Sequence, residues 1–177
     1  MPYTPAYNAT FAKPLANQLI ALIQRDQAAA LQIVNPSLDP IAEFHKGPGT
    51  PTAFPWLVLE VGSTKFDREA SGTRRSRSDI ALVLDVAHFD QETAQDHAQD
   101  YARMLDMVVT TATLADFTTP LPIAHPTVPS GTTTPPAADA VKEVFVESHR
   151  YAPVTLPEIQ APVLRVTLGV LFDLEEV

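Results

Sequence analysis

The sequence contains no cysteine among its 177 residues, and glycine is scarce, with only 6 residues. The absence of cysteine excludes disulfide bonds, thiolate metal sites, iron–sulfur clusters and thiol nucleophiles. The scarcity of glycine disfavours phosphate-binding loops, and neither a Walker motif nor a dinucleotide-binding fingerprint is present. No apolar run approaches the roughly 18 residues of a membrane-spanning helix. Thiol-based or iron–sulfur redox proteins, nucleotide-binding proteins with glycine-rich loops and membrane-spanning proteins are therefore disfavoured classes.

Positive charge is also in the minority. Lys and Arg number 12 against 21 Asp and Glu, which gives a formal net charge of −9. Broad, non-specific binding to nucleic acid needs clustered cations, so this balance argues against it. Proline, by contrast, is abundant at 17 residues. Average usage predicts roughly 9 for this length, and the excess indicates stiff, extended connections.

Motifs that would carry catalysis or a metal are missing. No two of the five histidines stand at helical i,i+4 spacing, and there is no HExxH. The serine motifs GxSxG and SxxK are absent. Paired carboxylates occur only on expected solvated faces or at the C-terminus, which is typical of solubility rather than acid–base chemistry. We expect no enzymatic activity, no cofactor and no metal.

Two amphipathic helices are predicted from apolar residues at helical spacing. The first spans about 12–32, and Asn35-Pro36 ends it. The second begins after Asp90, a preferred N-cap residue. Its expected buried stripe consists of Ala94, Ala98, Tyr101, Leu105, Val108 and Ala112.

Four strands are predicted, at 56–61, 78–88, 141–151 and 162–174. In the third, alternation places Val144 and Val146 on one face and Phe145, Glu147 and His149 on the other. The order α-β-β-α-β-β favours an α+β domain. Its mostly antiparallel sheet has two hairpins, and both helices pack on one face.

Residues 1–177 are expected to form a single domain with two extended loops. The first, at about 36–55, carries five prolines, and 41–44 could form one helical turn within it. The second, at about 113–137, holds six prolines and seven threonines. Its length exceeds the roughly 12–15 residues usual for a structureless loop, and such loops are commonly binding arms or disordered.

Five of the 12 cations fall within 13 residues. They are Lys65, Arg68, Arg74, Arg75 and Arg77. One interpretation is a basic finger that contacts an acidic partner or DNA phosphate. The other is an ordinary solvated hairpin tip, because Asp67 and Glu69 lie in the same run.

Aromatic residues beside the proline-rich loop suggest a second kind of surface. Phe44, Phe54 and Trp56 flank or lie within that loop, where one core does not readily reach all of them. They are candidates to anchor a subunit interface. Alternatively, they pack the loop onto its own domain.

The layout resembles the tail terminator (tail completion) proteins of long-tailed bacteriophages, with neck and minor tail proteins as near alternatives. The resemblance rests on the initial helix and on an order of segments that covers most of the chain. These segments are Pro55-Trp56-Leu57-Val58-Leu59-Glu60, Thr73-Arg74-Arg75, Ile80-Ala81-Leu82-Val83-Leu84-Asp85-Val86, the helix opened by Asp90 with Tyr101-Ala102-Arg103-Met104-Leu105, and a late hairpin ending in an apolar strand.

This resemblance implies a structural virion protein of the tail or neck, assembled in the bacterial host cytoplasm. Such proteins form a hexameric ring at the head-proximal end of the tail tube, where the ring ends tube polymerisation. The implied partners are further copies of the chain, the tail tube protein and the neck or head connector protein. DNA would pass through the lumen without specific binding. The alternative from a different class is a small ligand-binding module or hydrolase with an unrecognised site.

Overall fold

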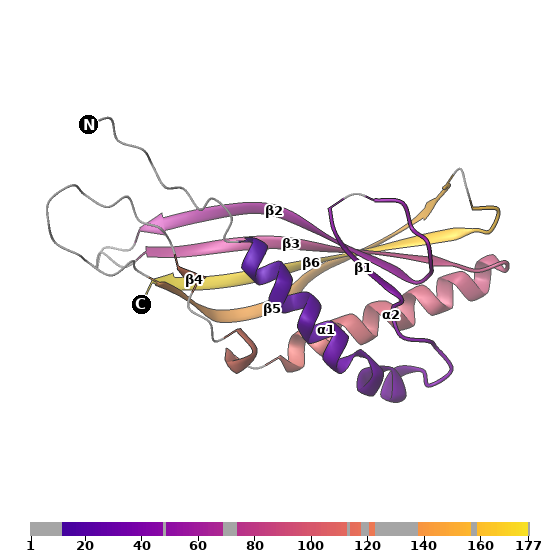
Figure 1. Ribbon diagram of the computed structural model, residues 1–177, viewed down its shortest axis with the longest axis horizontal. Coiled ribbons are helices and arrows are strands. Elements are labelled where there is room, and N and C mark those ends of the chain that lie inside the picture. The colour runs from indigo at the N-terminus through magenta and orange to yellow at the C-terminus, as the bar shows by residue number, and fades with distance from the viewer. Residues whose placement is uncertain are drawn as a thin grey trace, which may run out of the picture.

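The computed structural model describes residues 12–47, 49–68, 74–112, 114–117, 121–122, 138–156 and 159–176. Figure 1 shows a long sheet with two helices along it. The elements are α1 (Ala12–Val34), β1 (Glu43–Lys46), β2 (Trp56–Arg68), β3 (Arg74–Ala87), α2 (Gln91–Thr111), a 3-10 turn η1 (Leu114–Phe117), β4 (Leu121–Pro122), β5 (Ala138–Val154) and β6 (Val163–Glu176).

The strands form one sheet in the order β1-β2-β3-β6-β5-β4. All neighbouring strands are antiparallel except β1 and β2, which are parallel. The hairpins β2–β3 and β5–β6 join through β3 and β6, and α2 lies between them in the chain. The predicted α+β class with two hairpins and two helices is therefore confirmed, and the sheet gains two short strands at its edges.

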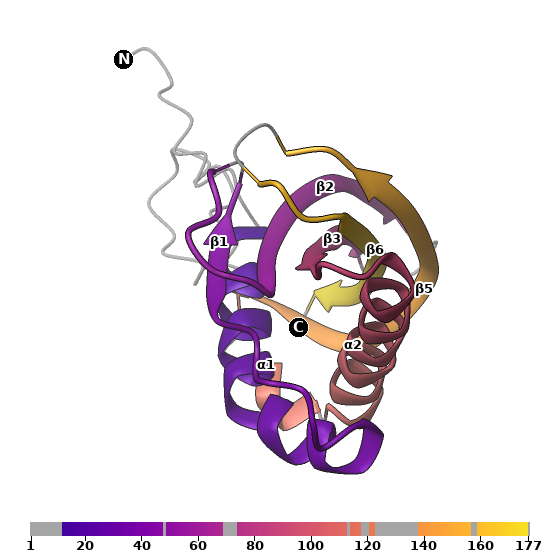
Figure 2. The same cartoon turned by 90° about the vertical axis from the view of Figure 1, so that its right-hand side faces the viewer.

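Both helices lie on the same face of the sheet (Figure 2). The stripe predicted for α2 is buried from Ala94 to Val108, and Ala112 packs against the core as a partly buried residue. Phe117 of η1 stacks edge-on against Phe172 of β6, with ring centroids 5.4 Å apart. The helix-facing sheet residues of the core are Leu57, Leu59, Ile80, Leu82, Leu84, Val86, Val166, Leu168, Val170, Phe172 and Leu174.

The expected helical turn at 41–44 was wrong, because residues 43–46 form strand β1. β1 pairs in parallel with the start of β2, and Phe44 lies opposite Leu57. A backbone hydrogen bond flanks β1 on each side. The Ala42 N–H donates to the Pro55 carbonyl, and the Gly47 N–H donates to the Leu59 carbonyl. The edge of β2 offers backbone hydrogen-bond partners to residues 43–46, and an isolated helical turn would leave most of its own backbone groups without such partners. The 36–55 segment is therefore not loop throughout.

The second expected loop also contains regular structure. Within 113–137, η1 and β4 are formed, and most of the remaining residues lie outside the described ranges. The predicted faces of β5 were partly wrong, because register shifts occur between Val141 and Glu143 and between Val146 and Ser148. A bulge reverses the alternation beyond it. His149 consequently lies opposite Leu168, on the same face as Val144 and Val146.

Candidate interaction surfaces

The predicted basic residues lie on paired positions at the end of the β2–β3 hairpin where β2 ends and β3 begins. Lys65 is opposite Arg77, and Arg68 is opposite Arg74. Arg75 is opposite Asp67. The side chains of Lys65 and Arg77 are exposed, whereas those of Arg68, Arg74 and Arg75 lie outside the described part of the structure. These strand ends are at the left of Figure 1, near the end of β6.

The neighbouring strand β6 brings acidic residues to this end. Arg77 lies opposite Asp173, and Asp173 lies opposite Glu143 of β5. Residues directly opposite on antiparallel strands share a face and have Cβ atoms about 4.5–5.5 Å apart. Because Phe172 and Leu174 face the helices, the row formed by Lys65, Arg77, Asp173 and Glu143 lies on the opposite, outer face. We call these four residues the charged row.

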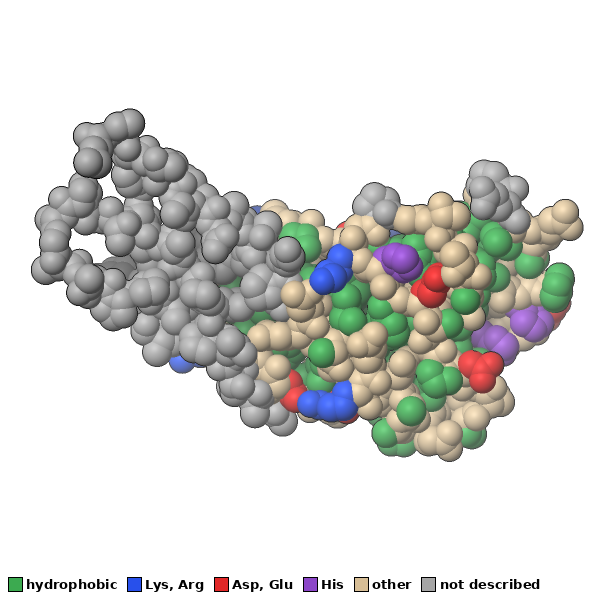
Figure 3. Space-filling model, in the orientation of Figure 1, with side chains coloured by type: hydrophobic (Ala, Val, Ile, Leu, Met, Phe, Trp, Pro, Cys, Tyr) green, Lys and Arg blue, Asp and Glu red, His purple; other side chains and the backbone are tan. Residues whose placement is uncertain are grey.

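The charged row changes the interpretation of the basic run. Arg75 likewise has an acidic residue, Glu175, at the opposite position of β6. Figure 3 shows charged side chains of both signs dispersed over the visible face, without a large patch of one sign among the coloured residues. At the level of the charged row, the outer face therefore carries Lys65 and Arg77 on the β2 side and Asp173 and Glu143 on the β5 side. The basic run remains a candidate contact.

The three candidate aromatic residues lie in different surroundings. Phe44 is half-buried against the main core, and Phe54 is half-buried against a small outer-face cluster of Trp56, Val58 and Val83. Trp56 is only 4% exposed, and its ring meets the His45 ring edge-on at 5.6 Å. Trp56 therefore packs within its own chain, and of these three candidates only Phe44 and Phe54 keep partly exposed side chains.

A buried ion pair lies on the outer face near the end of β3. The Asp85 carboxylate, in a residue only 1% exposed, accepts from Arg165 Nε at 2.7 Å and from Nη2 at 2.8 Å. This bond to Asp85 and, to a smaller extent, the charge of Glu60 raise the pKa of Arg165. The bidentate geometry joins β3 to β6. The pair therefore has a structural role. The one feature of the sequence that indicates it is Asp85, a charged residue within an otherwise apolar stretch of β3.

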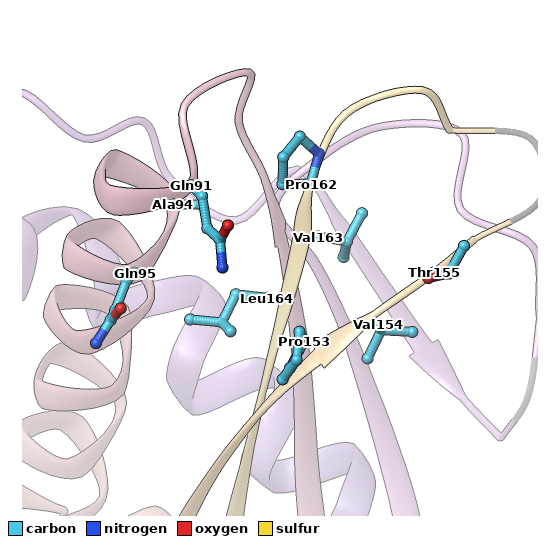
Figure 4. Close-up of a pocket in the computed structure, with 9 residues that line it drawn as sticks. All are labelled: Gln91, Ala94, Gln95, Pro153, Val154, Thr155, Pro162, Val163 and Leu164. Carbon is cyan, nitrogen blue, oxygen red and sulfur yellow. The ribbon is translucent and has the colours of Figure 1, made fainter.

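A shallow groove lies at the other end of the molecule (Figure 4). Its volume is about 210 Å³. Side chains from the first turns of α2 and from the ends of β5 and β6 line it. They are Gln91, Ala94, Gln95, Pro153, Val154, Thr155, Pro162, Val163 and Leu164. The lining combines apolar surface with glutamine amides and contains no ionisable group.

The turn that precedes α2 presents an apolar side chain beside this groove. Phe89 is 91% exposed. The turn itself is well fixed, because the Asp90 carboxylate caps α2 by accepting from the Thr93 hydroxyl and backbone N–H, each at 2.7 Å. The Thr93 hydroxyl is the main cause of the lowered pKa of Asp90. The capped turn thus holds the Phe89 side chain in solvent, two residues before Gln91 of the groove.

A second cavity of about 140 Å³ lies between α2 and the 37–39 and 54–55 segments. His97 and Tyr101 line it, and the Tyr101 hydroxyl donates to the Asp39 carbonyl at 2.6 Å. The His97 ring meets His88 edge-on at 5.4 Å. Among the described residues, no group of three or more histidine or acidic side chains is placed to hold a metal ion. Ser37 also lines this cavity, but its hydroxyl donates to Asn35 Oδ1 at 2.6 Å, and no described hydrogen bond joins it to His97.

Comparison with known proteins identifies a structural likeness alone. No family model matches the sequence, and no curated protein matches it. A chain from the solved structure titled "Virion of native gene transfer agent (GTA) particle" superposes with a TM-score of 0.54 at 12% identity. The match covers 94% of this chain and 99% of that one. The two chains share a fold along nearly their whole lengths.

No described helix is long and apolar enough to cross a membrane.

Proposed function

We propose that the protein is a structural component of a phage-like virion and acts as a tail terminator. The observation that carries this proposal is the end-to-end likeness in fold to a chain of a gene transfer agent virion. In this role the chain closes a ring at the head-proximal end of a tail tube, ends tube growth and joins the tail to the neck. Its partners are further copies of itself, the tube protein and the neck or connector protein.

The unlike ends of the molecule suit this role. A ring that joins two different structures needs a head-to-tail interface between subunits and two dissimilar end surfaces. One end carries the strand positions of Arg68, Arg74 and Arg75 beside the charged row, and the other carries the groove and Phe89. Phe44 and Phe54 are further candidates for contacts between subunits. We assign no catalytic group and no cofactor to this function.

The size of the groove disfavours a whole small-molecule substrate as its occupant. Ligand pockets commonly enclose about 300–1,000 Å³ and bury most of the ligand. The larger of the two cavities described above measures about 210 Å³. A groove of that size fits one or two side chains of a protein partner better than a whole substrate.

Light scattering and negative-stain electron microscopy of the purified chain test the proposal. We expect a concentration-dependent ring of about six copies, and we expect added protein to stop the elongation of polymerising tail tubes. Rings that bind an isolated connector but leave tube growth unchanged would support a neck protein instead. A chain that stays monomeric at every concentration, with tubes and connectors present, would refute a ring-forming virion role.

The basic residues receive a separate test. The triple variant Arg74→Ser, Arg75→Ser, Arg77→Ser is expected to weaken docking to the tube or the passage of DNA, because it removes cations from one end of the subunit. Its circular dichroism should match that of the native chain. A charge-matched control is the triple variant Lys46→Ser, Arg103→Ser, Arg150→Ser, which removes exposed cations elsewhere. Equal docking by both variants and the native protein would remove the basic residues from the interface.

A further inference from the structure

Both long outer strands have free backbone edges in the part of the chain that the structure describes. β1 pairs with β2 only through Leu59, so residues 60–68 have no described neighbour on that side. β4 pairs with β5 only at 138–139, so no further strand is described beside residues 140–154 on that side. A row of unpaired N–H and C=O groups is a template for pairing with another chain.

The two free edges are compatible with each other in direction. The order β2-β3-β6-β5 is antiparallel at every step, so β2 and β5 run in opposite directions. If β5 of one copy lies beside β2 of the next, the alternation of strand direction continues without a break. An edge-to-edge contact of this kind is head-to-tail, which is the kind that closes a ring.

The free segments also occupy the same level of the sheet. Through β3 and β6, Val61 shares a row with Val146, and Phe66 shares a row with Val141. A neighbouring copy related by rotation about a ring axis therefore brings the segment 60–68 alongside 140–148. The described bulges lie in these segments. A bulge increases the local twist and bends its strand, and sheets that join into a closed ring need such curvature.

At the level of the charged row, the two edges carry charges of opposite sign. Within one copy, Lys65 faces Arg77 and Asp173 faces Glu143, and like charges directly opposite one another destabilise a sheet. The cationic pair includes the free β2 edge, and the acidic pair includes the free β5 edge. A second copy alongside would place Lys65 near an acidic edge and so relieve both repulsions.

We propose that residues 60–68 of β2 pair antiparallel with residues 140–148 of β5 from a second copy of this chain, with Lys65 of one copy beside Glu143 of the next. This assignment rests on the proposed ring and names the contact that builds it. The contact joins the sheets of neighbouring subunits into one continuous sheet.

The absence of cysteine from the chain gives a direct test. In the double variant Lys65→Cys, Glu143→Cys, the two sulfur atoms of one copy are three strand spacings apart, about 14 Å. A disulfide requires Cα atoms within about 7 Å, so oxidation can join these positions only between copies. We expect a ladder of cross-linked species up to the size of the ring. Lys65→Cys, Glu147→Cys tests a register shifted along β5.

Two controls calibrate the ladder. Lys65→Cys alone can give cross-linked dimers at most, and Lys65→Cys with Arg103→Cys pairs the β2 edge with an exposed position on α2. One outcome is that microscopy shows native rings while neither double variant, with cysteine at 65 and 143 or at 65 and 147, gives more cross-linking than the controls. In that case the edge contact is wrong and the ring function stands. If the native chain forms no ring, the proposed function itself fails.

Charge reversal provides an independent readout. Lys65→Glu and Glu143→Lys are each expected to raise the protein concentration needed for ring assembly severalfold, and the combination should restore it. Arg103→Glu and Glu92→Lys, which make the same changes in charge at exposed positions of α2, should leave assembly unchanged. Single variants that assemble like these controls, or a double variant that is no better than either single, would contradict the proposed pairing.

Discussion

Replacing Arg165 by methionine removes one half of the buried ion pair and leaves the other half in place. The Asp85 carboxylate would then lie 1% exposed without the guanidinium that now donates to both of its oxygens. Methionine retains an unbranched stem of similar width, so the change isolates the loss of charge and hydrogen bonds.

The size of the effect follows from the burial of the two groups. Breaking a fully buried pair costs about 3–5 kcal/mol of unfolding free energy. The Arg165 side chain is 36% exposed, so water screens the pair, and we expect about 2–3 kcal/mol. For a domain of this length that loss corresponds to a fall in Tm of about 4–12 °C.

The assay is urea and thermal unfolding followed by circular dichroism, at one protein concentration below that of assembly because association adds apparent stability. The variant Asp85→Leu and the double variant Asp85→Leu, Arg165→Met complete a double-mutant cycle. The double variant should recover most of the loss, because it leaves no buried charge without a partner. A cost below about 0.5 kcal/mol for Arg165→Met, the range of ordinary surface changes, would refute the reasoning.

Three further perturbations test other parts of the structure. Tyr101→Phe should cost about 1 kcal/mol by removing the hydrogen bond to Asp39. Burial also raises the pKa of Tyr101 to about 12, so native stability should fall as pH rises from about 10 through 12, and the variant should lack that fall in pH-dependent unfolding. Asp90→Ala should lower Tm above about pH 4. Because the pKa of Asp90 is lowered in the folded protein, its carboxylate stabilises the fold only above that pKa. The variant should therefore lose less stability than the native protein on acidification. Phe89→Ser should leave the monomer's Tm unchanged and weaken binding to an end partner, measured by co-sedimentation with tubes or connectors.

The sequence predicted the elements that depend on local periodicity. Both helices and all four long strands lie where the apolar spacing indicated. A stripe such as Ala94 to Val108 shows in the sequence itself which face of the helix is buried. The short strands were missed for an opposite reason. Residues 43–46 have no strand periodicity of their own and become a strand through the edge of β2. The faces of β5 were partly mistaken because a bulge is a property of the pairing, which the alternating letters of one strand do not contain.

The candidate site depended still more on distant pairing. Between residues 65 and 77 the sequence shows a cationic run, and its acidic counterparts lie almost one hundred positions later, on β6. Two hairpins can join in more than one order, and only the adjacency of β3 and β6 places Asp173 opposite Arg77. The same adjacency leaves β2 and β5 as the outer long strands. The charge asymmetry of the sheet and its two free edges therefore have one origin, the order of the hairpins. Had β2 and β5 been adjacent instead, Lys65 and Glu143 would lie within one subunit and their charges would leave nothing for a neighbour to neutralise.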